Sequence, residues 1–277
     1  MGEDSARHFH TMEGVESAEE GNQGGTMRLR DFQRAEESVI AHCPVRHLCP
    51  VGVVCGRGDE EGKLMPTVME FDKADLLWTD HRYERHVFIV REGVLSCMAH
   101  VDPDGEAPFT LYGAGVGVGI ADLYVPHANA STYHLHAIVP GRICSLPSKA
   151  LKRHLEALGG EIQQNILAAS LYNQSTGALL QSMIASRPLL CHRLAMLLLC
   201  LETLAARGGT RPDVLRVTHD ELASRVLSDR ASVTRALHQM EEQGLVELGY
   251  RSVRITDALR KDDPEWIALC ETFSCVR

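Results

Sequence analysis

Residues 217–240 read VTHDELASRVLSDRASVTRALHQM, and this pattern predicts two short amphipathic helices joined by a tight turn. Thr218 is followed three residues later by Glu221, which is a capping box and marks the start of a helix. After a short turn, Asp229 is placed to cap a second helix. The inward faces of both helices are apolar and consist of Leu222, Ala223, Val226, Val233, Ala236, Leu237 and Met240. Two capped helices at this spacing predict a helix-turn-helix.

The outward face of the second helix carries polar side chains that suit DNA. Such side chains donate to guanine N7 and O6 and to phosphate oxygens in a major groove, and here they are Arg230, Ser232, Thr234 and Arg235. Two alternating runs over residues 244–255 predict a β-hairpin, or wing. The alternative is an ordinary helix pair and hairpin in an unrelated domain. The order of capping box, turn, polar face and wing favours DNA binding.

These residues resemble the Crp/Fnr family of bacterial transcription regulators. The family pattern is a Thr-capped helix, then Leu-Ala, Arg-Glu-x-Val-x-Arg-x-Leu and Gly-Leu-Ile, and it is carried here by Thr218, Leu222-Ala223, Arg230 to Leu237 and Gly244 to Val246. Two positions depart from it: Ala231 replaces a Glu that accepts from cytosine, and Leu227 replaces a turn Gly. The resemblance implies a homodimer that binds a double-stranded DNA operator and contacts RNA polymerase, and that is not an enzyme.

The composition is that of a globular protein large enough for one large or two modest domains, with 277 residues, 44% hydrophobic and 23% charged. No apolar run is long enough to cross a membrane and the N-terminus lacks a secretory pattern, so a cytoplasmic protein without a membrane partner is expected. The net charge of −9 argues against general affinity for nucleic acid. Five arginines between positions 225 and 254 nevertheless concentrate positive charge on the predicted DNA-binding face.

The chain divides into four predicted segments. Residues 1–36 are polar and expected to be disordered, and residues 37–147 contain a cysteine-bearing loop and short strands. Residues 148–187 predict connecting and dimerisation helices, and residues 188–277 the winged helix-turn-helix with a C-terminal tail. The predicted fold class is therefore α+β, with an N-terminal β-roll, or jelly roll, like the cyclic-nucleotide-binding effector domain of the family.

Glycine and proline interrupt the predicted strands of the β-roll. Gly93 is expected to turn the chain between two short strands, and Asp102-Pro-Asp-Gly105 is a strong hairpin signal.

A long helical pattern over residues 161–186 stands where the family has its dimerisation helix. Its seven-residue rows form a mixed seam, which suits a helix that pairs with a second copy and also packs on its own sensor domain. A plain core helix is the alternative. The seam residues expected at the dimer interface are Ile162, Ala169, Tyr172, Thr176, Leu179 and Met183.

Nine cysteines in a cytoplasmic chain argue against a disulfide framework and leave metal or redox sites open. Cys43, Cys49 and Cys55 are evenly spaced in a loop rich in proline and glycine, a spacing that is not diagnostic by itself. The oxygen-sensing Fnr branch is similar, because Cys43 and Cys49 match the last pair of its N-terminal motif and Cys144-Ser-Leu-Pro147 matches its fourth-ligand element. The resemblance implies a [4Fe-4S] cluster, with Cys55 substituting for the cysteine that Ile40 replaces.

Loss of such a cluster in oxygen is expected to release the N-terminal loop, shift a monomer–dimer equilibrium and thereby change operator affinity. Haem, with His127 as the first ligand to test, is an alternative cofactor, and a small effector or thiol redox chemistry is another. Cyclic-nucleotide binding is not expected, because residues 117–133 contain no arginine to hold the phosphate.

The remaining candidate ligands have plainer interpretations. Cys97, Cys191 and Cys200 are expected to be buried thiols, whereas Cys270 and Cys275 are alternative cluster ligands. A cupin-type enzyme would need paired histidines with a carboxylate, and the pair His134-x-His136 lacks a matching Glu.

Overall fold

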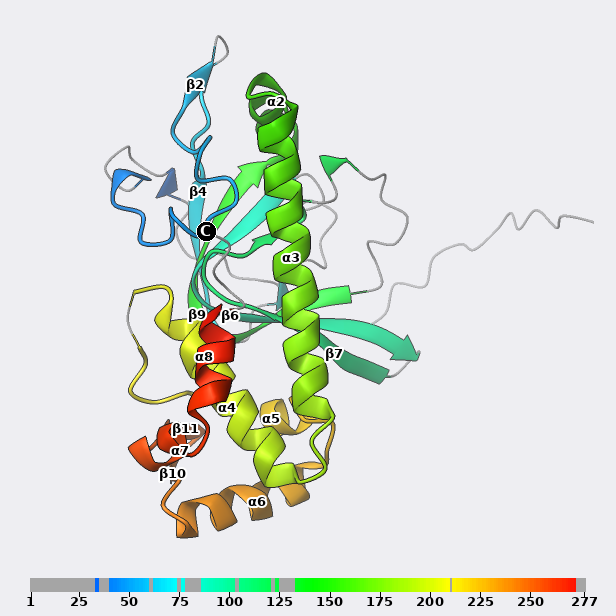
Figure 1. Cartoon of the computed structure of the whole chain (residues 1–277), viewed down its shortest axis with the longest axis vertical. Coiled ribbons are helices and arrows are strands. Elements are labelled where there is room, and N and C mark those ends of the chain that lie inside the picture. The colour runs from blue at the N-terminus through cyan, green and yellow to red at the C-terminus, as the bar shows by residue number, and fades with distance from the viewer. Residues whose placement is uncertain are drawn as a thin grey trace, which may run out of the picture.

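The structure is a computed structural model, and it describes residues 33–34, 40–59, 62–73, 76–77, 86–102, 105–120, 123–124, 133–209 and 211–272. An antiparallel sheet lies in its upper and middle part, the long helix α3 runs beside the sheet, α6 and α7 lie at the lower end, and α8 lies beside the sheet (Figure 1). Within the described part, no helix is both long and apolar enough to cross a membrane.

The sheet is antiparallel and has the order β1-β4-β9-β6-β7. These strands are β1 (Gln33–Arg34), β4 (Thr67–Phe71), β9 (Tyr133–Pro147), β6 (His86–Asp102) and β7 (Gly105–Tyr112). Two short strands extend it, since β5 (Leu76–Leu77) pairs with β9 and β8 (Gly117–Val118) pairs with β6, and a separate hairpin joins β2 (Gly58–Asp59) to β3 (Gly62–Lys63). The predicted jelly-roll-like sheet in an α+β fold is confirmed.

Strand β6 differs from its prediction, because Gly93 does not turn the chain. One continuous strand crosses that position with register shifts on both sides, and the turn signal marks a β-bulge. Gly93 has φ of 85°, and a Cβ atom there would lie 2.6 Å from the carbonyl oxygen of Val139. The glycine is needed because β6 and β9 approach closely there. The hairpin predicted at Asp102–Gly105 is confirmed by the pairing of these two residues.

Two helices follow the sheet, α2 (Ser148–Ala157) and α3 (Gly160–Ala185). Gly159, with φ of 91°, separates them. Helix α3 packs against β7 at Gly177, where a Cβ atom would collide with the Thr110 hydroxyl. The long helix is therefore seated on its own sheet along part of its length.

The C-terminal domain consists of five helices and a hairpin in the described residues. They are α4 (Leu190–Ala206), α5 (His219–Arg225), α6 (Arg230–Glu242), β10 (Val246–Gly249), β11 (Ser252–Ile255), α7 (Asp257–Asp262) and α8 (Pro264–Thr272). Their core is continuous with the sheet, because Val94, Leu111 and Ile138 belong to the same buried cluster as α4. The two halves therefore share one packed interface.

Candidate nucleic-acid interface and thiol site

Helices α5 and α6 begin with the caps that the sequence predicted. The Thr218 hydroxyl accepts from the backbone N–H of Glu221 at 3.2 Å, and the Glu221 carboxylate accepts from the backbone N–H of Thr218 at 2.6 Å. The Asp229 carboxylate accepts from the backbone N–H of Ser232 at 2.8 Å. All seven apolar residues predicted to face inward are buried. The turn between the helices places Leu227 in the left-handed region, with φ of 54°.

The outer face of α6 presents two exposed arginines. Arg235 donates to the Ser232 hydroxyl at 2.9 Å, and Arg230, whose side chain is 69% exposed, lies 3.4 Å from the Asp220 carboxylate. The Thr234 hydroxyl is engaged inside the domain, since it donates to the carbonyl of Arg230 at 2.9 Å and also contacts a ring nitrogen of α5. Ser232 thus orients an arginine, and Thr234 connects the two helices.

A cleft of about 520 Å³ lies beside the N-termini of α5 and α6 and the tip of the wing. It includes His219 and Tyr250, which the sequence reasoning missed, and its lining residues are Thr218, His219, Asp220, Arg230, Gly249, Tyr250 and Arg251. Tyr250 is 93% exposed. Burial and then the charge of Arg230 lower the pKa of His219, whose ring nitrogen Nδ1 lies 2.8 Å from the Thr234 hydroxyl. The position of His219 directly after the capping threonine was the available signal.

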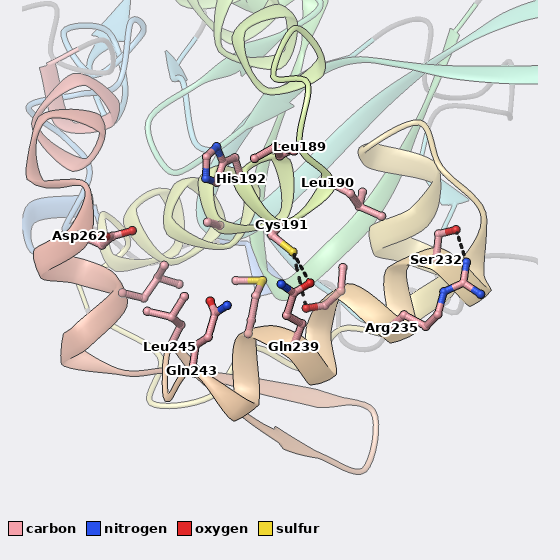
Figure 2. Close-up of a pocket in the computed structure, with 14 residues that line it drawn as sticks. Leu189, Leu190, Cys191, His192, Ser232, Arg235, Gln239, Gln243, Leu245 and Asp262 are labelled. Atoms are coloured by element: carbon pink, nitrogen blue, oxygen red, sulfur yellow. Dashed lines mark hydrogen bonds between the residues drawn. The ribbon is translucent and has the colours of Figure 1, made fainter.

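A second cleft of about 530 Å³ lies between the start of α4 and α6 (Figure 2). Its walls come from the start of α4, from α6 and from α7, and are formed by Leu189, Leu190, Cys191, His192, Ala195, Ser232, Arg235, Ala236, Gln239, Met240, Gln243, Leu245, Leu259 and Asp262. The thiol of Cys191 donates to the side-chain oxygen of Gln239 at 3.6 Å. Cys191 is half-buried, so the prediction of a fully buried thiol is wrong here, because the helix starts at the edge of the cleft.

A polar contact between the two halves involves the capping box itself. The Lys73 ammonium, in the loop after β4, donates to both carboxylate oxygens of Glu221, at 2.7 and 3.0 Å. Burial raises the pKa of Glu221, but the hydrogen bonds from Lys73 and Thr218 outweigh it and the pKa is lowered. Gln181 of α3 also donates to the carbonyl of Arg225 at the end of α5, at 2.8 Å. Helix α5 is therefore contacted near its start by the loop after β4 and at its end by α3.

Half of the predicted dimer seam on α3 is engaged in the protomer itself. Thr176 is buried beside β7, and Ile162 and Met183 pack against hydrophobic cores. Ala169 is half-buried, whereas Tyr172 and Leu179 are exposed. Leu171, which the heptad rows omitted, is 56% exposed beside them. The dimer seam stays a prediction, and sheet packing leaves Tyr172 and Leu179 as its exposed members in the protomer.

The three loop cysteines lie against the end of β9 that carries Cys144. Cys49 and Cys144 pack on the same apolar cluster, which also contains Val51 and Val54 of the loop and Ile89 of β6. Burial raises the pKa of Cys49, and the thiols of Cys144, Cys55 and Cys43 raise it further. Burial likewise raises the pKa of Cys55 to about 11 and that of Cys144 to about 12. The fold thus places all four predicted ligands within electrostatic range of one another.

The four thiols do not form a compact site for one metal ion. Among the described residues, no group of three or more His, Cys, Asp or Glu side chains is arranged to hold a metal ion. Each thiolate sulfur that binds a single ion must lie roughly 2.3 Å from it. The thiolate ligands of an iron–sulfur cluster bind different iron atoms and therefore lie farther apart. The donor set, made entirely of thiols from a loop and a strand, fits the cluster in its chemistry.

The other cysteines lie elsewhere. Cys97 is buried within β6, and Cys200 and Cys270 are buried against each other between α4 and α8. A hydrogen bond with Cys200, followed by burial, raises the pKa of Cys270. The thiol of Cys270 is therefore enclosed in the C-terminal core, and Cys275 lies outside the described residues.

The predicted histidine sites are only partly covered by the structure. His127 and most of residues 117–133, where a haem ligand or a nucleotide phosphate was considered, lie outside the described residues. The rings of His134 and His136 meet edge to face with centroids 4.6 Å apart, and His134 is buried.

Comparisons with known proteins agree with this architecture. Residues 192–260 match the family model of the Crp-like helix-turn-helix domain. The chain is 23% identical over 207 residues to the global nitrogen regulator of Synechocystis, covering 70% of this chain and 86% of that protein.

Among solved structures, a CRP-family transcriptional regulator from Thermus thermophilus aligns with a TM-score of 0.56 and 21% identity, covering 70% of this chain and 96% of its own. FixK2 from Bradyrhizobium japonicum aligns with a TM-score of 0.54 and 15% identity, covering 72% and 96%. The fold is that of Crp/Fnr regulators.

Proposed function

We propose that the chain is a transcription regulator that binds DNA through α6. The observation that carries this proposal is the pair of exposed arginines, Arg230 and Arg235, on a helix whose other face is buried and whose start is capped. Guanidinium groups in this position suit bidentate donation to guanine N7 and O6. The match of residues 192–260 to a Crp-like helix-turn-helix domain supports the same conclusion.

The regulator acts as a dimer in this proposal, with α3 as the pairing helix. Leu171, Tyr172 and Leu179 form an exposed apolar patch on a helix that is otherwise seated on its own sheet. Two recognition helices then read half-sites about 34 Å apart, which is one turn of DNA. RNA polymerase is the protein partner that the resemblance to the family implies.

Selection of binding sites from random DNA tests this function. The selected sequences are expected to be inverted repeats whose half-site centres are about 10 to 11 base pairs apart, as one helical turn requires. Tyr172→Glu combined with Leu179→Glu serves as the dimer variant and should lose affinity for the repeat while it stays folded. Arg211→Ala, which removes an exposed arginine outside α6, is the control and should bind the repeat as the wild type does. Failure to enrich any sequence contradicts the proposal.

We further propose that the sensor half holds a [4Fe-4S] cluster on Cys43, Cys49, Cys55 and Cys144. Such a cluster, when bound, supplies a centre sensitive to oxygen and redox state. The loop that carries three of the ligands packs through Val51 and Val54 on the apolar cluster that includes Ile166 of α3. Rearrangement of the loop therefore alters the packing of the proposed dimer helix.

Anaerobic purification with an absorption spectrum and iron and sulfide analysis tests the cluster. About four irons per chain and a broad band at about 400 nm that bleaches in air are expected of a cluster held by four thiolates. Cys144→Ser should lose the band, and Cys191→Ser should retain it. A colourless protein without iron contradicts the cluster and leaves DNA binding standing, whereas a sharp Soret band assigns the sensor to haem.

A further inference from the structure

The tip of the wing is a tight turn whose place relative to α6 is fixed. Strands β10 and β11 pair as far as Gly249 and Ser252, so only Tyr250 and Arg251 lie between them. A backbone N–H of β10 donates to the Glu241 carboxylate of α6 at 2.9 Å. The hairpin is also held on its other side, because β11 pairs with the segment before α5. The wing therefore presents the two turn residues from a fixed position beside the recognition helix.

Both residues of the turn have features that suit contact with a partner molecule. Arg251 has φ of 51°, a left-handed conformation in which glycine or asparagine is the usual residue. Strained conformations of this kind are concentrated at sites that bind ligands. Tyr250 is the most exposed of the large hydrophobic residues in the described part of the chain. A single exposed apolar residue is ordinary by itself, and what distinguishes Tyr250 is its neighbours.

The neighbours of the wing tip are the first residues of α6. Tyr250 and Arg251 line the cleft of about 520 Å³ together with Arg230, the residue at which α6 begins. Apart from a histidine, the ionisable residues of this cleft are two arginines and one acid, Asp220, which lies 3.4 Å from Arg230. The cleft is therefore positively charged beside an exposed aromatic ring, and an anion with an apolar part fits both features.

DNA supplies such an anion at this place. The proposed function puts the N-terminal residues of α6 against base edges in the major groove. The wing tip, beside the start of α6, then meets the sugar–phosphate backbone that borders this groove. The minor groove lies on the other side of the same backbone, where deoxyribose rings present apolar C–H edges next to the phosphates that an arginine binds.

We propose that the wing tip grips the DNA backbone beside each half-site, with the ring of Tyr250 packed against a deoxyribose in the minor groove and Arg251 on the adjoining phosphate. This inference rests on the proposed DNA binding by α6. Tyrosine suits the contact because its ring supplies a large area at a small cost in conformational entropy. Because the ring is uncharged and sugars carry no sequence information, Tyr250 adds affinity without releasing counter-ions or selecting bases.

The experiment uses the full-length protein and the operator selected from random DNA. Tyr250→Ala removes the ring, Tyr250→Phe removes only the hydroxyl, and Phe109→Ala removes an exposed aromatic ring from β7 as the control. Fluorescence anisotropy at several salt concentrations measures the affinities. Hydroxyl-radical cleavage maps the sugars exposed in the minor groove, and methylation by dimethyl sulfate maps guanine N7 in the major groove. Circular dichroism checks folding, and Tyr250→Ser, with a residue common in turns, replaces Tyr250→Ala if that variant does not fold.

Tyr250→Ala is expected to bind the operator and non-specific DNA about tenfold more weakly, as loss of a well-packed aromatic contact does. The slope of log affinity against log salt concentration should keep its wild-type value, whereas Arg251→Ala should reduce the magnitude of that slope by about 0.9 for one lost phosphate contact. In Tyr250→Ala the protected sugars beside each half-site should become open to cleavage while the guanines stay protected. Tyr250→Phe and Phe109→Ala should match the wild type.

Three results would overturn the proposed wing contact. Wild-type affinity and wild-type sugar protection in Tyr250→Ala would remove the role of Tyr250 and leave DNA binding by α6 standing. Loss of guanine protection together with sugar protection would show that Tyr250 supports the position of α6 and does not contact the backbone. A wild type that selects no sequence from random DNA would overturn the proposed function, and the wing contact with it.

Discussion

Arginine side chains have different environments in the two halves of this protein. In the half that contains the sheet, Arg91 of β6 is only 7% exposed, whereas in the helix-turn-helix half Arg230 is 69% exposed and Arg235 is exposed beside it. A buried guanidinium needs its anion within the protein, and an exposed one at a capped helix is free to meet an anion from outside. The environment of the same side chain thus distinguishes an internal electrostatic site from a binding surface.

The largest expected effect comes from removing an exposed arginine. Arg235→Ala should weaken binding to the selected operator by about 1–3 kcal/mol, or roughly 5- to 150-fold, because a bidentate contact to guanine is lost. Arg251→Ala, at the wing tip, should weaken binding to specific and to non-specific DNA by about the same factor, as loss of a phosphate contact does. Fluorescence anisotropy on both DNAs measures the two affinities. Normal operator affinity in Arg235→Ala would contradict the assignment of α6 as the recognition helix.

The contact between the halves is expected to have a smaller effect. Lys73→Met and Glu221→Gln should each destabilise the protein by about 1 kcal/mol, and the double variant should cost little more than either, because one interaction is removed in all three. Glutamine still serves in a capping box, so Glu221→Gln isolates the charge. Denaturant unfolding measures the cycle. Additive effects would show that Lys73 and Glu221 act independently.

The same pair predicts a dependence on pH. Because the pKa of Glu221 is lowered in the folded state, its contribution to stability is full above the ordinary glutamate pKa of about 4.3 and is lost as the pH falls through the lower, folded value. The stability difference between wild type and Glu221→Gln should therefore shrink as the pH falls below about 4. A difference that stays constant from about pH 7 to about pH 3 would contradict the ion pair.

The two halves also differ in how much of their structure could be predicted from the sequence. The caps at Thr218 and Asp229 involve residues three positions apart, so local chemistry was enough to place both helices. The bulge at Gly93 depends on a close approach to Val139, and the pairing of Lys73 with Glu221 joins residues 148 positions apart. Such long-range contacts leave no periodic signal in the sequence.

The smallest effect concerns the turn inside the helix-turn-helix. Leu227 has φ of 54° and an exposed side chain, so it bears the strain of the left-handed conformation and loses little burial when truncated. Leu227→Gly should raise stability by about 0.5–1 kcal/mol, because relief of a strain of about 1–2 kcal/mol exceeds the entropy cost of glycine, which is about 0.5–1 kcal/mol. Differential scanning calorimetry should show a midpoint about 2–4 °C higher at the upper end of that gain. Ser228→Gly, at the neighbouring position without positive φ, is the control and should not stabilise. A lower midpoint for Leu227→Gly would show that the leucine side chain contributes more through its contacts than its backbone conformation costs.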